Sequence, residues 1–129
     1  MSKIDRFEDV VAWQKARLLT KEIYAHTRAA EFAKDFGLKD QIQRASVSTM
    51  SNIAEGFERG DDKEFLQFLS TSKGSCGEVK SNLYVALDQK YIVQPQFEHL
   101  YAKADEVGKL IFSFMDYLRN SEFRGRKYK

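Results

Sequence analysis

Hydrophobic and small residues recur at helical spacing in four stretches of the chain. The most regular pattern begins at Gln94-Pro95, where the spacing alternates between three and four residues over three heptads. Such a seam is typical of helices that pack nearly parallel to one another, and proline is tolerated in the first turn of a helix. The residues of this seam are Phe97, Leu100, Ala104, Val107, Ile111, Phe114 and Leu118.

A second seam passes through "SKGSCGEVKS", residues 72–81, and consists of Phe65, Leu69, Ser72, Cys76, Val79, Leu83 and Ala86. A loop has no reason to keep this register, so the pattern predicts one uninterrupted helix over residues 65–90. Asp61 is positioned to cap it. The two interior glycines, Gly74 and Gly77, each cost roughly 1 kcal/mol relative to alanine. This cost is tolerable if the glycines let a neighbouring helix approach closely.

Two more helices are predicted, from about Phe7 to Ala30 and from about Leu38 to Phe57. The first has Ala12, Ala16, Leu19 and Ile23 on one face, and the second has Leu38, Ile42, Ala45, Ile53 and Phe57. No stretch indicates strand pairs joined by hairpin turns. The sequence therefore predicts an all-α protein, an antiparallel up-down four-helix bundle, with residues 1–129 forming a single domain.

Poor helix formers crowd the stretch from Arg44 to Gly60, "RASVSTMSNIAEGFERG". If the chain reverses near Gly60, Ser48 lies opposite Ser72, and Arg44 lies near enough to Glu78 to form an ion pair. One interpretation is a tight helix–helix contact. The other is a polar groove that holds a ligand or RNA. The contact residues are Arg44, Ser48, Asn52, Ser72, Cys76 and Glu78.

Charge is distributed unevenly, although the net charge is only +2. The segment from Arg119 to Lys129 carries five basic residues and one acid, Glu122, and the rest of the chain is mildly acidic. From about residue 119 we expect a flexible basic arm. Such an arm can bind nucleic acid or an acidic partner, or it is simply a solvated terminus.

Catalytic and metal-binding patterns are not found in the sequence. The single cysteine rules out an internal disulfide and indicates a reducing compartment, so we expect a cytoplasmic protein. No apolar run reaches the length needed to span a membrane. A di-iron bundle needs Glu-x-x-His pairs, and neither His26 nor His99 belongs to one. Cys76, on the seam, is expected to be a buried apolar residue rather than a nucleophile. We expect no enzyme activity, cofactor or metal.

Three segments resemble a known family: "FEDVVAWQKA", "LKDQIQRASVSTMSNIAEGFERGDDKEFLQFL" and "GSCGEVKSNLYVAL". Together, over roughly residues 7–92, they look like the bacterial four-helix bundle proteins encoded in intervening sequences of 23S ribosomal RNA genes. That family is similar to the accessory proteins of diversity-generating retroelements. The resemblance implies a barrel-shaped homopentamer, and in the retroelement relatives such a ring binds nucleic acid and a reverse transcriptase.

This chain departs from the family pattern in three places. Thr49-Met50 stands where an Ile-Pro pair is usual, Gln43 replaces an arginine, and Ser72-Lys73 replaces Ala-Leu. The missing proline puts a family-typical helix kink in doubt. The missing arginine removes one cationic position, and Lys73 adds another.

Two functions fit these observations. The first is a non-enzymatic, oligomeric scaffold associated with RNA or DNA. Its candidate binding residues are Arg119, Arg124, Arg126 and Lys127, with Arg59, Lys73 and Lys80 in addition. The second is a protein-interaction module that recruits a partner such as a reverse transcriptase without binding nucleic acid directly. The 17 aromatic residues (10 Phe, 6 Tyr, 1 Trp) favour protein interfaces, and Phe32 and Phe36 are expected contact residues.

Overall fold

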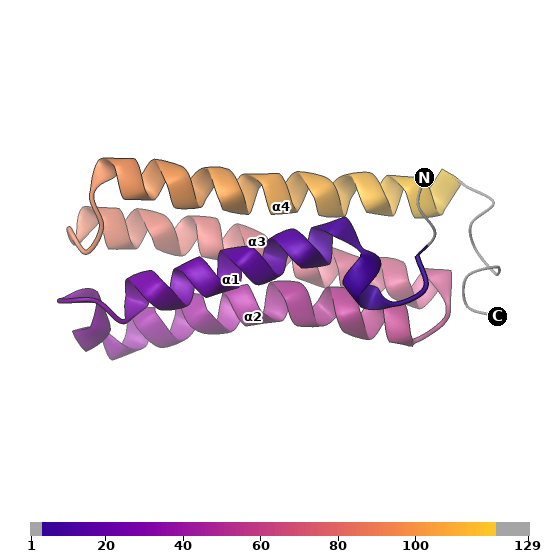
Figure 1. Ribbon diagram of the computed structural model, residues 1–129, viewed down its shortest axis with the longest axis horizontal. Helices are drawn as coiled ribbons and strands as arrows, with labels where there is room; N and C mark the ends of the chain where they lie inside the picture. The colour runs from indigo at the N-terminus through magenta and orange to yellow at the C-terminus, as the bar shows by residue number, and fades with distance from the viewer. Residues whose placement is uncertain (1–3, 121–129) are drawn as a thin grey trace.

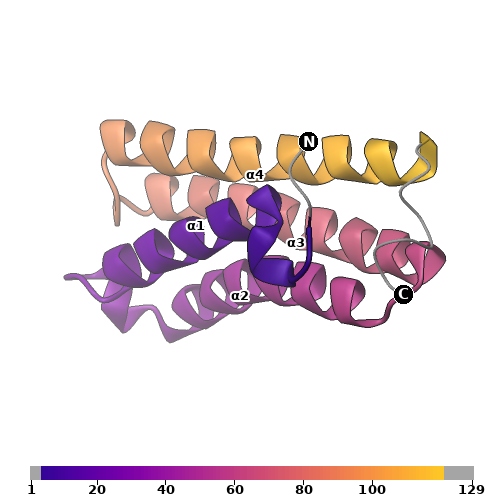
Figure 2. The same ribbon diagram turned by 45° about the vertical axis from the view of Figure 1, so that its right-hand side comes forward.

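Four long helices lie side by side in the computed structural model, which describes residues 4–120 (Figures 1 and 2). They are α1 (Val11–Thr27), α2 (Phe36–Glu58), α3 (Asp62–Asp88) and α4 (Gln94–Asn120). Short 3-10 helices, Phe7–Asp9 and Phe32–Lys34, precede α1 and α2. Each helix packs against the next in sequence, and α4 closes the bundle against α1. The prediction of an all-α four-helix bundle is confirmed.

Side-chain contacts between the first and last helices show their relative direction. Lys15 Nζ lies 4.0 Å from Glu106 Oε2, and Glu22 Oε1 lies 2.6 Å from His99 Nε2. Residue numbers rise along α1 as they fall along α4, so these helices are antiparallel. Short connections reverse the chain between successive helices, giving the up-down arrangement in Figure 1.

The predicted seams form the core. Every seam residue of α3 and α4 named above is buried, as are those of α1 and α2. The helix over residues 65–90 was predicted to be uninterrupted, and α3 contains Gly74, Cys76 and Gly77 without a break. The first helix is shorter than predicted because the chain forms a separate 3-10 turn before Val10.

The α2–α3 turn has the chemistry that the sequence indicated. Gly60 adopts φ 74°, the left-handed conformation in which glycine carries no side-chain penalty. Asp61 Oδ2 then accepts a hydrogen bond of 3.2 Å from the backbone N–H of Glu64, which satisfies one of the free donors at the start of α3.

Small and polar residues line the contact between α2 and α3. The Ser48 and Ser75 hydroxyls lie 2.9 Å apart, and the Ser72 hydroxyl donates to the Thr49 carbonyl at 2.5 Å. Asn52 Nδ2 donates to the Ser48 carbonyl at 2.9 Å and to its hydroxyl at 3.0 Å. Ser48 thus lies against Ser75, one helical turn from the predicted Ser72.

Three details of the sequence interpretation are wrong. Arg44 forms its ion pair with Asp40, at 2.8 Å and one turn earlier on the same helix, rather than with Glu78. Phe32 is not an exposed contact residue, because it is buried and stacks on Tyr91 with ring centroids 5.3 Å apart. The third concerns the glycines of α3.

Gly74 and Gly77 do not permit a close helix approach. A Cβ added at either position would meet no neighbouring atom within 4 Å, because the space around both glycines is open. The close approach occurs at Gly56 of α2 instead, where a Cβ would lie 2.7 Å from Phe65 Cδ1 and 2.7 Å from Phe68 Cβ.

The expected C-terminal arm can be compared only at its start. Arg119 and Asn120 are the last residues of α4 and are helical. Residues 121–129 lie outside the described part of the chain.

The glycines give a matched stability prediction. Gly56→Ala should lower the free energy of unfolding by roughly 1–3 kcal/mol, because its methyl group overpacks the α2–α3 contact. Gly74→Ala should raise it by up to about 1 kcal/mol, because alanine is the better helix former and space is open. Urea denaturation of both variants measures the two changes. Equal effects at the two positions would contradict the assignment of the close contact to Gly56.

Candidate nucleic-acid interface

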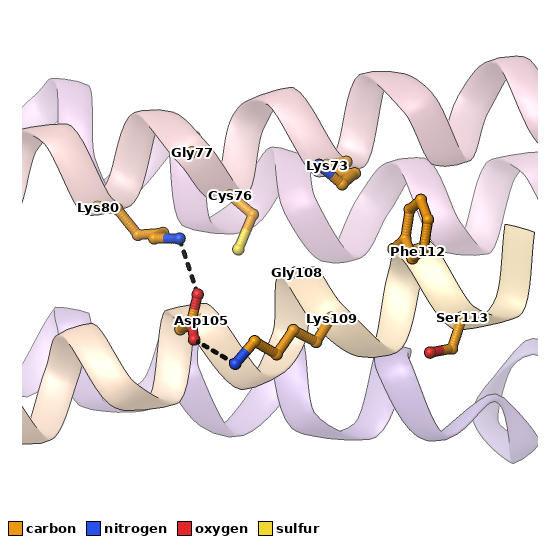
Figure 3. Close-up of a pocket in the computed structure, with 9 residues that line it drawn as sticks. All are labelled: Lys73, Cys76, Gly77, Lys80, Asp105, Gly108, Lys109, Phe112 and Ser113. Atoms are coloured by element: carbon orange, nitrogen blue, oxygen red, sulfur yellow. Dashed lines mark hydrogen bonds and ion pairs between the residues drawn. The ribbon is translucent and has the colours of Figure 1, made fainter.

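A groove of about 490 Å³ runs between α3 and α4 on the outside of the bundle. We call it the α3/α4 groove. Its lining residues are Lys73, Cys76, Gly77, Lys80, Asp105, Gly108, Lys109, Phe112 and Ser113. Most of these residues recur three or four positions apart on their helix, so they lie along one face of it. Because the helices are antiparallel, the Lys80 end meets Asp105 and the Lys73 end meets Phe112 (Figure 3).

Glycine makes the groove possible. Gly77 on α3 and Gly108 on α4 contribute no side chains where the helices face each other, and Cys76 lies between them (Figure 3). A Cβ on Gly77 would meet nothing within 4 Å, and one on Gly108 would touch only the Cys76 sulfur, at 3.9 Å. The missing side chains at these two positions therefore contribute to the opening.

One carboxylate holds two of the three lysines in the groove. Asp105 Oδ1 lies 2.9 Å from Lys80 Nζ, and Asp105 Oδ2 lies 3.1 Å from Lys109 Nζ (Figure 3). The hydrogen bond from Lys80 lowers the pKa of Asp105, and the same bond raises the pKa of Lys80. Both shifts favour the charged forms, so Asp105 and Lys80 keep their charges throughout the neutral pH range.

Lys73 completes the cationic lining. It is exposed and forms no ion pair with any other described residue. Three ammonium groups against one carboxylate leave the groove with a net charge of +2, as large as the net charge of the whole chain. An anion entering the groove would meet one free lysine and two that Asp105 orients.

Aromatic rings mark the two ends of this face. The Phe112 ring projects from α4 toward α3 at one end and is 55% exposed (Figure 3). Beyond Lys80, at the other end, Tyr84 is 51% exposed and packs on Phe97 and Tyr101, with centroid distances of 4.9 and 5.8 Å. Lys80 Nζ lies 5.0 Å from the centroid of Tyr101, within the range of a cation–π contact.

The thiol in the floor is not a nucleophile at neutral pH. Cys76 is buried, and its sulfur donates to the Ala104 carbonyl at 3.0 Å. Burial raises the pKa of the thiol to about 11, against an ordinary value of 9.0. Since only the thiolate attacks electrophiles, this cysteine contributes shape rather than reactivity.

The structure separates the candidate cations identified in the sequence into two groups. Lys73 and Lys80 line the α3/α4 groove, whereas Arg59 and Arg119 lie at the end of the bundle where α2 turns into α3 and α4 ends (Figure 1). Arg59 already pairs with Glu55 and Glu64, at 3.2 Å each, and its guanidinium lies over the Phe68 ring. The remaining candidates, Arg124, Arg126 and Lys127, lie outside the described residues.

Sequence reasoning missed Lys109, Asp105, Phe112 and Tyr84. Tyr101, Asp105, Gly108 and Phe112 do share one face of α4, next to its heptad seam, and this spacing is readable from the sequence. What the sequence does not supply is the register that places this face beside Lys73 and Lys80.

The described residues, 4–120, contain no cluster of metal-binding side chains. Within that range no three His, Cys, Asp or Glu side chains gather to hold an ion. His99 pairs with Glu22, and His26 Nδ1 lies 2.9 Å from the Glu22 carbonyl.

No helix in the described range is both long and apolar enough to cross a membrane.

Comparison with known proteins gives one family and one fold. The sequence profile of the 23S rRNA-intervening sequence protein family matches residues 8–113. Among solved structures, the chain is similar to a protein of unknown function from the S23 ribosomal protein family of Bacteroides thetaiotaomicron. The TM-score is 0.76 at 22% sequence identity, over 82% of this chain and 96% of the other. No curated protein matches the chain significantly.

Thiol labelling tests the assignment of Cys76. We expect a disulfide reagent at pH 8 to react with native protein far more slowly than with protein unfolded in urea, because both burial and the raised pKa suppress the thiolate. The labelling rate should follow the opening of the bundle. Rapid stoichiometric labelling of the native protein would contradict this assignment.

Proposed function

This chain belongs to the 23S rRNA-intervening sequence protein family, and from that premise we propose that it is a non-enzymatic, oligomeric scaffold that binds RNA in the cytoplasm. The observation that carries the proposal is the convergence of Lys73, Lys80 and Lys109 on one groove, with an exposed aromatic ring at its end. The RNA contacts are assigned to this groove.

The chemistry of the groove suits a phosphate backbone. Lysine ammonium groups contact phosphate oxygens without reading sequence, and such contacts supply most of non-specific nucleic-acid affinity. The protomer as a whole is close to neutral, so attraction to RNA depends on where its cations gather. Asp105 opposes phosphate binding by its own charge, but it also holds Lys80 and Lys109 in place over the groove.

The side of the bundle formed by α1 and α4 supports self-association. Val11 and Leu18, two turns apart on α1, are 51% and 54% exposed. Val11 also borders a mostly apolar hollow of about 320 Å³, together with Leu110 and Tyr117 of α4. Exposed apolar surface of this kind is a common feature of protein interfaces. We assign it to contacts between copies, in a pentamer that presents several α3/α4 grooves at once.

The same apolar side supports the second candidate function. If it binds a different protein, such as a reverse transcriptase, the bundle is a recruitment module, and RNA binding by this chain is not required.

Salt titration distinguishes the two functions. We expect the protein to bind structured RNA with an affinity that falls steeply with salt concentration. The double variant Lys73→Gln/Lys109→Gln should reduce the slope of log K against log salt by about 1.4 to 1.8, because each lost phosphate contact accounts for roughly 0.7 on a single strand and 0.9 on a duplex. Asp105→Asn should strengthen binding, because it removes the opposing charge. Fluorescence anisotropy measures all three proteins.

Two controls belong to the same experiment. Lys39→Gln removes a lysine from α2 whose Nζ lies 5.3 Å from the centroid of the Phe36 ring, outside both the α3/α4 groove and the apolar side formed by α1 and α4, so it should leave the slope nearly unchanged. A chain ending at Asn120 tests the contribution of Arg124, Arg126 and Lys127. Absence of binding at low salt would exclude RNA binding and favour the recruitment module.

Light scattering tests self-association. At micromolar concentration we expect a mass of about five times the 15.0 kDa of one chain. Leu18→Glu should lower this mass because it places a charge in the apolar interface, whereas Val47→Glu, on the exposed surface of α2, should not. A stable monomer of the unaltered protein would exclude the oligomer.

A further inference from the structure

We infer that the α3/α4 groove selects single-stranded over duplex nucleic acid, stacking bases on Phe112 and Tyr84 while its lysines contact the intervening phosphates. This inference rests on the proposed RNA-binding function and adds the class of nucleic acid that the groove accepts.

The order of groups along the groove carries the inference. Starting from the α2–α3 end, the groove presents Phe112, then Lys73 and Lys109, then Lys80 (Figure 3). Tyr84 lies just beyond the lining residues, where it packs on Tyr101, the ring that Lys80 Nζ contacts. Aromatic rings that flank a row of cations are the recurring arrangement in proteins that bind single strands, because every base has a face that can stack.

The cationic stretch has a defined length. Lys73 and Lys80 are seven residues apart on α3, which corresponds to ~10 Å at 1.5 Å per residue, and Tyr84 follows one turn later. One turn beyond each aromatic residue the chain is acidic and exposed, with Asp88 following Tyr84 and Asp116 following Phe112. These two carboxylates oppose an anionic chain just beyond each ring, and the stretch between the rings leaves room for a few nucleotides.

Both rings have free area, but they are not on a flat surface. Phe112 projects across the groove toward α3, and Tyr84 lies against Phe97 and Tyr101 with about half of its surface exposed (Figure 3 shows Phe112). In a duplex the base faces are already stacked on their neighbours and are closed to a protein side chain. Only an unpaired base can reach either ring, so stacking discriminates between the two forms.

The lysines alone would not discriminate. Phosphates are present on duplexes and single strands alike, so Lys73, Lys80 and Lys109 attract both. Preference for single strands must therefore depend on the aromatic residues. Substitutions can remove the lysine contacts and the aromatic stacking separately.

The experiment measures binding of a labelled single-stranded RNA and of the same strand annealed to its complement, at several salt concentrations. The unaltered protein should bind the single strand more tightly. Phe112→Leu should weaken single-strand binding roughly fivefold to a hundredfold and leave the salt slope unchanged, because no charge is lost. Duplex binding should be unaffected. Phe36→Leu, the same substitution at a 73% exposed phenylalanine outside the groove, should have no effect.

A second variant provides a direct signal. Phe112→Trp places an indole at the end of the groove, and its fluorescence should be quenched by the single strand beyond the change seen for the unaltered protein, whose only tryptophan is Trp13. Thermal unfolding of each variant checks that the bundle remains folded.

The outcomes separate the inference from the function on which it rests. Equal affinity for the two RNAs, or a Phe112→Leu variant that binds the single strand normally, would overturn stacking while leaving the lysine-dependent salt slope intact. Failure to bind either RNA at low salt would overturn both proposals.

Discussion

Two uninterrupted heptad seams keep α3 and α4 side by side over their whole length. A seam that repeats every seven residues stays buried only if the partner helix runs nearly parallel to it. All seven seam positions on each of these helices are buried. The faces next to the seams are consequently held together as well, and they form the walls of the α3/α4 groove. The position of every group in the groove follows from this packing.

The groove is carried by two long helices, and this affects the entropic cost of binding a ligand there. Its lysines project from the middle of 27-residue helices, and Asp105 restricts two of them further. The backbone that carries the lysines is already ordered before a ligand arrives, so binding would not have to order it, which reduces one of the costs of association. Phosphate contacts from such a surface differ in this respect from contacts made by a basic segment that must be ordered on binding.

Much of the fold could be predicted from the sequence, because hydrophobic spacing reports which face of a helix is buried. The seams were readable in this way, and the Gly60 reversal and the Asp61 cap were readable from the preference of glycine for turns and of aspartate for helix starts. The same spacing says nothing about how closely a partner approaches the remaining faces. Gly74 and Gly77 therefore looked like points of close contact, although the close contact is at Gly56 against Phe65.

The candidate site was predictable only in part for a related reason. Lys73 and Lys80 were recognisable as cations on one helix, but the groove needs α4 in a particular register. The Arg44 prediction was wrong because it overlooked a contact within the helix. Asp40, one turn away, pairs with Arg44, and no partner on another helix is needed. Contacts within a helix follow from spacing, whereas contacts between helices require the packed structure.

Gly77, which lines the α3/α4 groove, lowers the stability of α3 but keeps the groove deep. Alanine at position 77 would be the better helix former and would find empty space around its methyl group. A laboratory selection for heat resistance alone would thus be expected to fill this position, and so to make the opening above Cys76 shallower. Screens that reward thermal tolerance without assaying a ligand would gradually make the α3/α4 groove shallower, whether or not a ligand depends on it.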